Sequence, residues 1–187
     1  MGAVCAHFLW DGCGLHPFFI GVMKMNRNVR QMVRAALIAA LYVALTYLQN
    51  FMIPGSASMA IQFRASEALC ILAFFTPAAV PGLAVGCLLF NLTFAGSLPL
   101  DFLVGTLATV GATASMRLLR KLPFFGFLMP ALWNGALVGW ELSVYIGGGF
   151  WSNALYVVIG EAAVLLTLGT ALYFALKSRN LHIRLFE

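Results

Sequence analysis

The chain has 187 residues, of which 62% are hydrophobic and only 9% are charged. A soluble domain carries about 25% charged residues, so the composition excludes an ordinary water-soluble domain and indicates an integral membrane protein. The net charge of +5 does not indicate nucleic-acid binding, because the basic residues follow the pattern expected of loops beside a membrane. The length allows about six helical spans of roughly 20 residues each, with no room for a soluble domain.

Residues 1–24 precede the first apolar segment and contain two cysteines and two histidines. Their spacing matches no common zinc pattern, and the segment lacks the basic start of a signal peptide, so we expect no metal site there. Met23 and Met25 directly precede a basic sequence that can start a helix. We therefore expect residues 1–24 to be a disordered extension, with the functional protein beginning near these methionines.

Six apolar segments follow, and we interpret each of them as a membrane helix. The second is short and carries two charged residues, so we expect it to be tilted or partly covered by its neighbours. The predicted fold is an all-α bundle of six transmembrane helices in residues 25–180, followed by a short tail at 181–187. The segments are Val33–Ile53, Ile61–Thr76, Ala78–Phe94, Pro99–Leu119, Phe124–Ile146 and Trp151–Leu176.

The basic residues lie on one side of this predicted bundle. Lys and Arg occur before the first segment, between the fourth and fifth, and after the sixth, whereas the three opposite loops contain neither. The positive-inside rule then predicts a cell-membrane protein with both termini in the cytoplasm. One of the outer loops contains Gly147–Gly149, which we expect to be a flexible element.

One arginine and four acids interrupt the apolar segments. A charged side chain at membrane depth is costly, and it usually faces the bundle interior and marks a ligand or ion pathway. In the predicted orientation most of these charges lie in the outer half of the bundle, together with three amide side chains. We therefore predict a pocket that is loaded from outside and prefers a cationic or donor-rich small molecule. The candidate binding residues are Gln62, Arg64, Glu67, Asn91, Asp101, Asn134, Glu141 and Glu161.

Structural roles for these residues stay open at this point. Arg64 and Glu67 are three residues apart, so they can form an ion pair on one helical face. Asp101 can cap a helix, and an amide within a span can hydrogen-bond across helices. Glu141 and Glu161 have no basic neighbour in sequence, so each can have a partner elsewhere in the bundle.

Small residues repeat at four-residue spacing on three of the segments. Ala35 and Ala39, with Ala36 and Ala40 beside them, form a flat stripe on the first segment, and glycine pairs recur on the third and fifth. Such stripes let helices approach closely. For the glycine pairs we expect packing inside the bundle.

The sequence contains no recognisable signature of catalysis. All three histidines lie outside the apolar segments, and H-E-x-x-H is absent, so we expect no enzyme. G-x-x-x-x-G-K-[ST] is also absent, so any ATP would be used by partner subunits and this chain needs no cofactor. Three alternatives are a secondary transporter with Asp101 and Glu161 as ion sites, an intramembrane enzyme that uses the carboxylates, and a structural membrane subunit.

The chain resembles the QueT family in a run of motifs. They are Ile61–Leu69, Phe74–Asn91, Leu100–Thr109, Asn134–Glu141 and Gly160–Glu161. The similarity extends over about residues 25–176, and the N-terminal extension is not part of the family pattern. The resemblance implies a substrate-binding S component of an energy-coupling factor (ECF) transporter. Such a six-helix subunit captures its substrate outside the cell and docks on a transmembrane coupling subunit with two cytoplasmic ATPase subunits.

The resemblance also implies a substrate and a partner surface. The substrate would be a queuosine precursor, in particular prequeuosine, an aminomethyl-deazaguanine. Its base has N–H donors and its aminomethyl group is an ammonium at neutral pH, so both parts suit the carboxylates. In this family an Ala-x-x-x-Ala face on the first helix contacts the coupling subunit, which implies that role for Ala35, Ala36, Ala39 and Ala40.

Overall fold

The computed structural model describes residues 26–54, 64–94 and 97–178, and every regular element in them is helical. The predicted all-α class is therefore confirmed. The predicted extension at 1–24, the tail at 181–187 and Gln62 lie outside the described residues. The elements are α2 (Arg27–Met52), η1 (Ala65–Ile71), α3 (Leu72–Phe75), α4 (Ala79–Thr93), α5 (Asp101–Leu118), α6 (Pro123–Tyr145), α7 (Phe150–Val164), η2 (Leu165–Gly169) and α8 (Thr170–Ser178).

Two helical stretches in the described part of the chain are long and apolar enough to cross a membrane. They are α2 and the run Phe150–Ser178, in which α7 and α8 are joined by the π-helical turn η2. Two further apolar helices, Ala65–Phe75 and Ala79–Thr93, are shorter. Many large apolar side chains are exposed around the bundle, as expected of helices that face lipid. The number of membrane spans stays a prediction.

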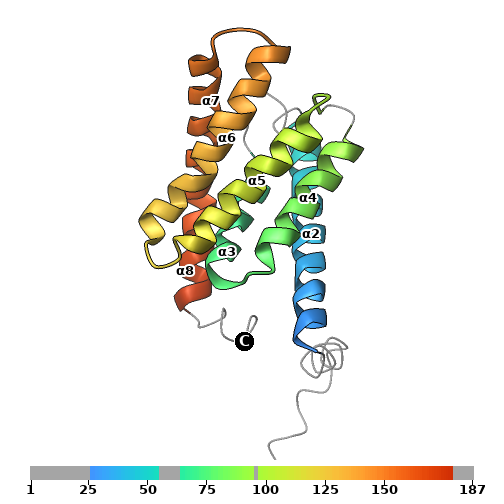
Figure 1. The fold of residues 1–187 in the computed structure, drawn as a ribbon, viewed down its shortest axis with the longest axis vertical. Coiled ribbons are helices and arrows are strands. Elements are labelled where there is room, and N and C mark those ends of the chain that lie inside the picture. The colour runs from blue at the N-terminus through green and yellow to red at the C-terminus, as the bar shows by residue number, and fades with distance from the viewer. Residues whose placement is uncertain (1–25, 55–63, 95–96, 179–187) are drawn as a thin grey trace, which may run out of the picture.

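The long helices form an arc around a central segment (Figure 1). α2 packs on α4, α4 on α5, α5 on α6 and α6 on α7, while η1 and α3 lie inside and contact helices on both sides. Glycines allow α4 to approach α2 closely. A Cβ at Gly82 would lie 2.7 Å from the Ala35 carbonyl oxygen, and one at Gly86 would lie 2.9 Å from Tyr42 Cβ. The expected internal packing of this glycine pair is confirmed.

The second predicted span, Ile61–Thr76, was expected to be tilted or partly covered by its neighbours, and the covering is confirmed in its described part. Its described part is the 3-10 helix η1 and the single turn α3, and residues 66–74 are all buried. The two elements together extend roughly 20 Å, which is too short for a hydrocarbon core of about 30 Å. The described part of the segment therefore lies in the core of the bundle and is too short to cross a membrane by itself.

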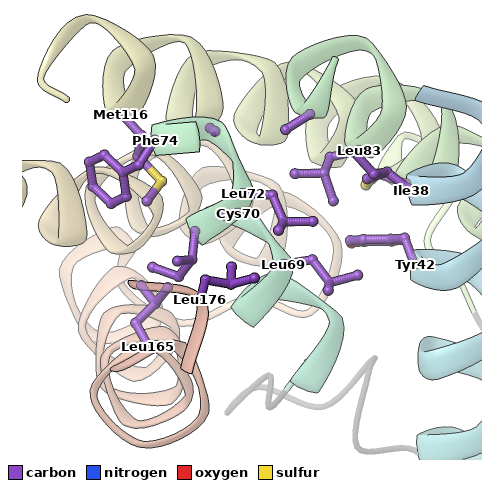
Figure 2. Close-up of a cluster of buried hydrophobic side chains, with 14 residues drawn as sticks. Ile38, Tyr42, Leu69, Cys70, Leu72, Phe74, Leu83, Met116, Leu165 and Leu176 are labelled. Atoms are coloured by element: carbon purple, nitrogen blue, oxygen red, sulfur yellow. The ribbon is translucent and has the colours of Figure 1, made fainter. Parts of the chain in front are cut away.

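This central segment joins the two sides of the arc through apolar packing. Its side chains lie between those of α2 on one side and those of η2 and α8 on the other (Figure 2). Because neighbouring helices cover it, its residues need not follow the hydropathy of a membrane-facing helix. The buried side chains include Ile38, Tyr42, Leu69, Cys70, Leu72, Leu83, Leu165 and Leu176.

Basic residues gather at one end of the bundle. Apart from Arg64, the Lys and Arg residues that the structure describes lie where α2 begins, where α5 ends, or at the end of α8 (Figure 1). Arg117 donates to the carbonyl oxygens of Phe74 at 3.2 Å and Ala73 at 3.5 Å. It thereby satisfies carbonyl groups at the C-terminus of α3, as basic side chains often do.

The opposite end contains the start of α5, the end of α6 and the start of α7 (Figure 1). Here α6 connects to α7 through Gly147 and Gly148, whose φ angles are +89° and +84°. Glycine adopts such angles without steric cost. Asn153 on α7 donates from Nδ2 to the Gly147 carbonyl oxygen at 3.0 Å, so the turn is tied to the helix that follows it.

Candidate functional site

All four acids in the described part of the chain are buried together with one arginine. Glu67 is 1% exposed, Asp101 2%, Glu141 0%, Glu161 2% and Arg64 5%. Arg64 interacts electrostatically with Glu67, Asp101, Glu141 and Glu161. Arg64 and the four acids, which come from four separate stretches of the sequence, therefore form one acid cluster inside the bundle, and the acids outnumber the arginine four to one.

Four different elements position the acids. Glu67 lies on the central helix η1, Asp101 is the first residue of α5, Glu141 lies near the end of α6, and Glu161 lies within α7. Asp101 does not cap the N-terminus of its own helix. Its Oδ2 instead accepts a hydrogen bond from the backbone N–H of Leu98 at 2.9 Å, which holds the turn before α5.

Glu67 belongs to a closed hydrogen-bond network between α2 and η1. The Tyr42 hydroxyl donates to Glu67 Oε1 at 2.7 Å, and the Cys70 thiol donates to Glu67 Oε2 at 3.1 Å. Thr46 donates to Ser66 Oγ at 2.7 Å in the same interface. Both oxygens of Glu67 thus have partners within the protein.

Four buried residues on α4, α5, α6 and α7 each have at least one open side-chain oxygen. Five buried oxygen atoms there have no hydrogen-bond partner: both carboxylate oxygens of Glu141, Asp101 Oδ1, Asn91 Oδ1 and Glu161 Oε2. The nearby amide N–H groups donate elsewhere, since Asn91 Nδ2 donates to the Asp101 carbonyl oxygen at 2.8 Å and Asn134 Nδ2 donates to Glu161 Oε1 at 3.1 Å. Buried polar atoms are normally hydrogen-bonded, so a group of open acceptors indicates a place for a donor from outside the chain.

The carboxyl groups of Asp101 and Glu141 are neighbours that interact electrostatically. Two neighbouring carboxylates repel each other unless a proton or a cation lies between them. Gly105, one turn after Asp101, gives the neighbouring side chains room. A Cβ there would lie 2.8 Å from Asn91 Nδ2 and 4.0 Å from Arg64 Nη1, so the glycine allows both side chains to lie against α5.

A model of the QueT transporter family matches residues 32–178 of this chain. The chain belongs to the QueT transporter family. It is also similar to a curated protein named "Queuosine precursor transporter QueT" from Lactococcus lactis subsp. cremoris (strain MG1363). The two are 32% identical over 157 residues, which cover 79% of this chain and 84% of the relative. No solved structure matches. Family membership and the long apolar helices identify a membrane protein.

Two side chains of this QueT family member that contact the acid cluster were not among the predicted site residues. Tyr42 and Cys70 donate to Glu67, and both are fully buried. The sequence contains a signal for the first of them. Tyr42, Thr46 and Gln49 are spaced as i, i+4 and i+7, so they form a polar stripe on one face of the otherwise apolar α2.

The alanines predicted to contact a partner lie on two different faces of α2. Ala39 is buried and Ala35 is half-buried, with the Ala35 backbone against Gly82 of α4. Ala36 and Ala40 are exposed. Of the four predicted residues, these two present the surface that another protein can reach.

An apolar groove of about 320 Å³ lies elsewhere, between α6 and the run from α7 to α8. It is lined by side chains such as Phe127, Leu165 and Tyr173, and none of the four acids borders it. The groove therefore suits an acyl chain better than a polar ligand. In the part of the chain that the structure describes, no group of three or more His, Cys, Asp or Glu side chains could hold a metal ion.

Proposed function

We propose that this QueT family member is the substrate-binding S component of an ECF-type importer and that it captures a queuosine precursor, in particular prequeuosine. The five open oxygens of Asn91, Asp101, Glu141 and Glu161 carry the proposal. A buried carboxyl group must be protonated, hydrogen-bonded or paired with a cation, so this site favours a ligand that brings donors and positive charge. Prequeuosine brings both, through its base edge and its aminomethyl group.

The proposed orientation places both termini in the cytoplasm and the site toward the outside. The described basic residues other than Arg64 lie at the end of the bundle opposite the start of α5, where Asp101 lies (Figure 1). By the positive-inside rule, the basic end faces the cytoplasm. Substrate then enters from the outer end, where Asp101 and Glu141 are located.

The proposed partners are a transmembrane coupling subunit and two cytoplasmic ATPase subunits. The chain has no phosphate-binding loop, so ATP hydrolysis needs other subunits, and binding and release involve no covalent chemistry by this chain. Ala36 and Ala40 are the proposed contact with the coupling subunit, because they are small, exposed and one turn apart.

Calorimetric binding to the purified chain in detergent tests the proposed substrate. We expect prequeuosine to bind and guanine, which lacks the aminomethyl group, to bind much more weakly. Absence of prequeuosine binding to a protein that is monodisperse and unfolds cooperatively would show that the substrate is wrong.

Uptake by cells tests the partner surface separately. Ala36→Leu and Ala40→Leu should leave ligand binding by the purified chain unchanged and should abolish uptake in cells that contain the ATPase subunits. Leu48→Phe enlarges an exposed side chain of the same helix outside the stripe and serves as the matched control. Normal uptake by both alanine variants would contradict the proposed docking face.

The alternative function is an ion-coupled secondary transporter of a small cationic or purine-like solute. The adjacent carboxyl groups of Asp101 and Glu141 support it, because such a pair can also hold a proton or an inorganic cation. Vesicles that contain this chain alone, with an ion gradient and no ATPase, separate the two functions. Uptake under these conditions would favour the alternative.

A further inference from the structure

We infer that the acid cluster contains two subsites with different specificities: Asn91, Asp101 and Glu141 bind the cationic side arm of the ligand, and Glu161 binds the edge of its base. This inference rests on the proposed function, since it takes the ligand to be a base that carries an aminomethyl arm. It adds the assignment of each acid to one part of the ligand.

The arm subsite presents open oxygens from three helices. Asn91 Oδ1 comes from α4, Asp101 Oδ1 from α5, and the two oxygens of Glu141 from α6, and none has a hydrogen-bond partner. All three residues are at most 5% exposed. An alkylammonium has three N–H donors and no acceptor, so it can donate once to each of the three side chains.

The amide of Asn91 is oriented for this role. Its Nδ2 donates to the Asp101 carbonyl oxygen at 2.8 Å, which fixes which end of the amide faces the protein backbone and leaves Oδ1 as an acceptor. Three acceptors on separate helices suit a compact group whose donors rotate freely. They suit a guanidinium less well, because its donors lie in one plane.

The charges at the arm subsite also favour a cation. The carboxyl groups of Asp101 and Glu141 interact with each other, and Arg64 interacts with both but also with Glu67 and Glu161. One guanidinium shared among four acids leaves the Asp101–Glu141 pair short of positive charge. An ammonium between the two carboxyl groups removes their mutual repulsion.

Glu161 has a single open acceptor, and it lies at a different level along α6 from Glu141. Its Oε1 is held by Asn134 Nδ2 at 3.1 Å, so only Oε2 is open, and it can accept an N–H from the base edge. Asn134 precedes Glu141 by seven residues on α6, which corresponds to about 10 Å along the helix axis. The two subsites are thus separated along α6, as the two ends of an elongated ligand require.

Two ligands that differ only in the side arm separate these assignments. One is the aminomethyl-deazaguanine, and the other is the same base with a nitrile in place of the aminomethyl group, so that it has no ammonium. Calorimetric affinities of both are measured for the wild type, Glu141→Gln and Glu161→Gln. Ser143→Ala is the control on α6, since the Ser143 hydroxyl donates to the Trp140 carbonyl oxygen and not to the cluster.

We expect the wild type to prefer the aminomethyl base. Glu141→Gln should weaken binding of that base about 10- to 100-fold, as expected for a charged hydrogen bond, and should change the affinity for the nitrile base less than about 3-fold. Glu161→Gln should weaken both bases by similar factors. Ser143→Ala should match the wild type.

An equal loss of affinity for both bases in Glu141→Gln would overturn the assignment, as would a loss confined to the aminomethyl base in Glu161→Gln. If Glu141→Gln does not fold, the affinities of Asp101→Asn for the two bases are compared instead, and the same criterion applies to the arm subsite. A folded wild type that binds both bases equally refutes the arm subsite while the proposed substrate class stands. A folded wild type that binds neither base refutes the proposed substrate, and the subsites with it.

Discussion

Glu67 and Glu141 are both buried glutamates in the same cluster, yet their surroundings differ completely. Both oxygens of Glu67 accept hydrogen bonds, from Tyr42 and from Cys70, whereas neither oxygen of Glu141 accepts any. Their exposed fractions, 1% and 0%, do not distinguish them. The Glu67 carboxylate is therefore satisfied by α2 and η1, whereas the Glu141 carboxyl group lacks a donor, and this difference supports the proposed ligand contact at Glu141.

A buried acid can therefore have either of two roles in this bundle, a structural one or a ligand-binding one. Where the protein supplies donors, the acid stabilises the fold, and its removal leaves those donors unpaired. Where the protein supplies only acceptors, the acid destabilises the empty protein and becomes favourable when a cation arrives. The number of hydrogen-bond partners therefore separates a structural acid from a candidate binding acid, and four substitutions test the distinction.

Glu67→Ala should have the largest effect on stability. It removes the acceptor of two buried donors and leaves a void in the central segment, so we expect the free energy of unfolding to fall by about 3–5 kcal/mol. Thermal unfolding of the purified chain in detergent measures this, with Ser143→Ala as the control. An unchanged midpoint would show that the network around Glu67 does not stabilise the fold.

Tyr42→Phe should destabilise the protein less. It preserves the ring in the core and removes only the hydroxyl that donates to Glu67 Oε1, so we expect a loss of about 1–3 kcal/mol. Affinity for the aminomethyl base should stay within about 3-fold of the wild type. A large loss of affinity at unchanged stability would instead place Tyr42 in direct contact with the ligand.

Glu141→Gln should change stability in the opposite direction. It replaces a buried carboxyl group that has no donor with an amide that can donate to neighbouring acceptors such as Asp101, so the ligand-free protein should gain about 1 kcal/mol. The wild type should be stabilised by about 2.7 kcal/mol at a ligand concentration of 100 times Kd, and the variant should show much less at that same concentration. Destabilisation of the ligand-free variant would mean that Glu141 has a structural partner.

Gly105→Ala should change stability least. Alanine favours the helix by about 1 kcal/mol, but its Cβ would lie 2.8 Å from Asn91 Nδ2, so the two effects should nearly cancel. The displaced amide should weaken binding of the aminomethyl base several-fold. Calorimetry beside thermal unfolding checks both parts, and unchanged affinity would argue against a role for Asn91.

The sequence was sufficient to predict the helical class and the residues of the acid cluster. Charged residues are rare in apolar segments and are costly in lipid, so Arg64, Asp101, Glu141 and Glu161 stand out without knowledge of the fold. Hydropathy also located α4, α5 and α6 to within a few residues. These features depend on local composition, which a single sequence contains.

The covering of the second segment was expected from its length and charges, but its short 3-10 form and the division of the cluster could not be predicted in this way. The hydropathy of Ile61–Thr76 is the same for a membrane helix and for a short core helix, and only the surrounding helices decide between them. Spacing suggested an ion pair between Arg64 and Glu67, but the partners that saturate Glu67 include Tyr42, which is 25 residues away. Hydrogen bonds across such separations depend on tertiary packing.

The positive φ angle of Gly147 in the α6–α7 turn determines which enantiomer of an amino acid can replace it. Nothing lies within 4 Å of a Cβ placed at Gly147, so an extra methyl group has space, but the φ of +89° disfavours any L-residue. The mirror-image amino acid has the opposite preference. D-Alanine at Gly147, introduced by chemical synthesis, should therefore fit the turn without strain and stiffen the connection. L-Alanine, which has the same atoms and differs only in its configuration, should strain the turn.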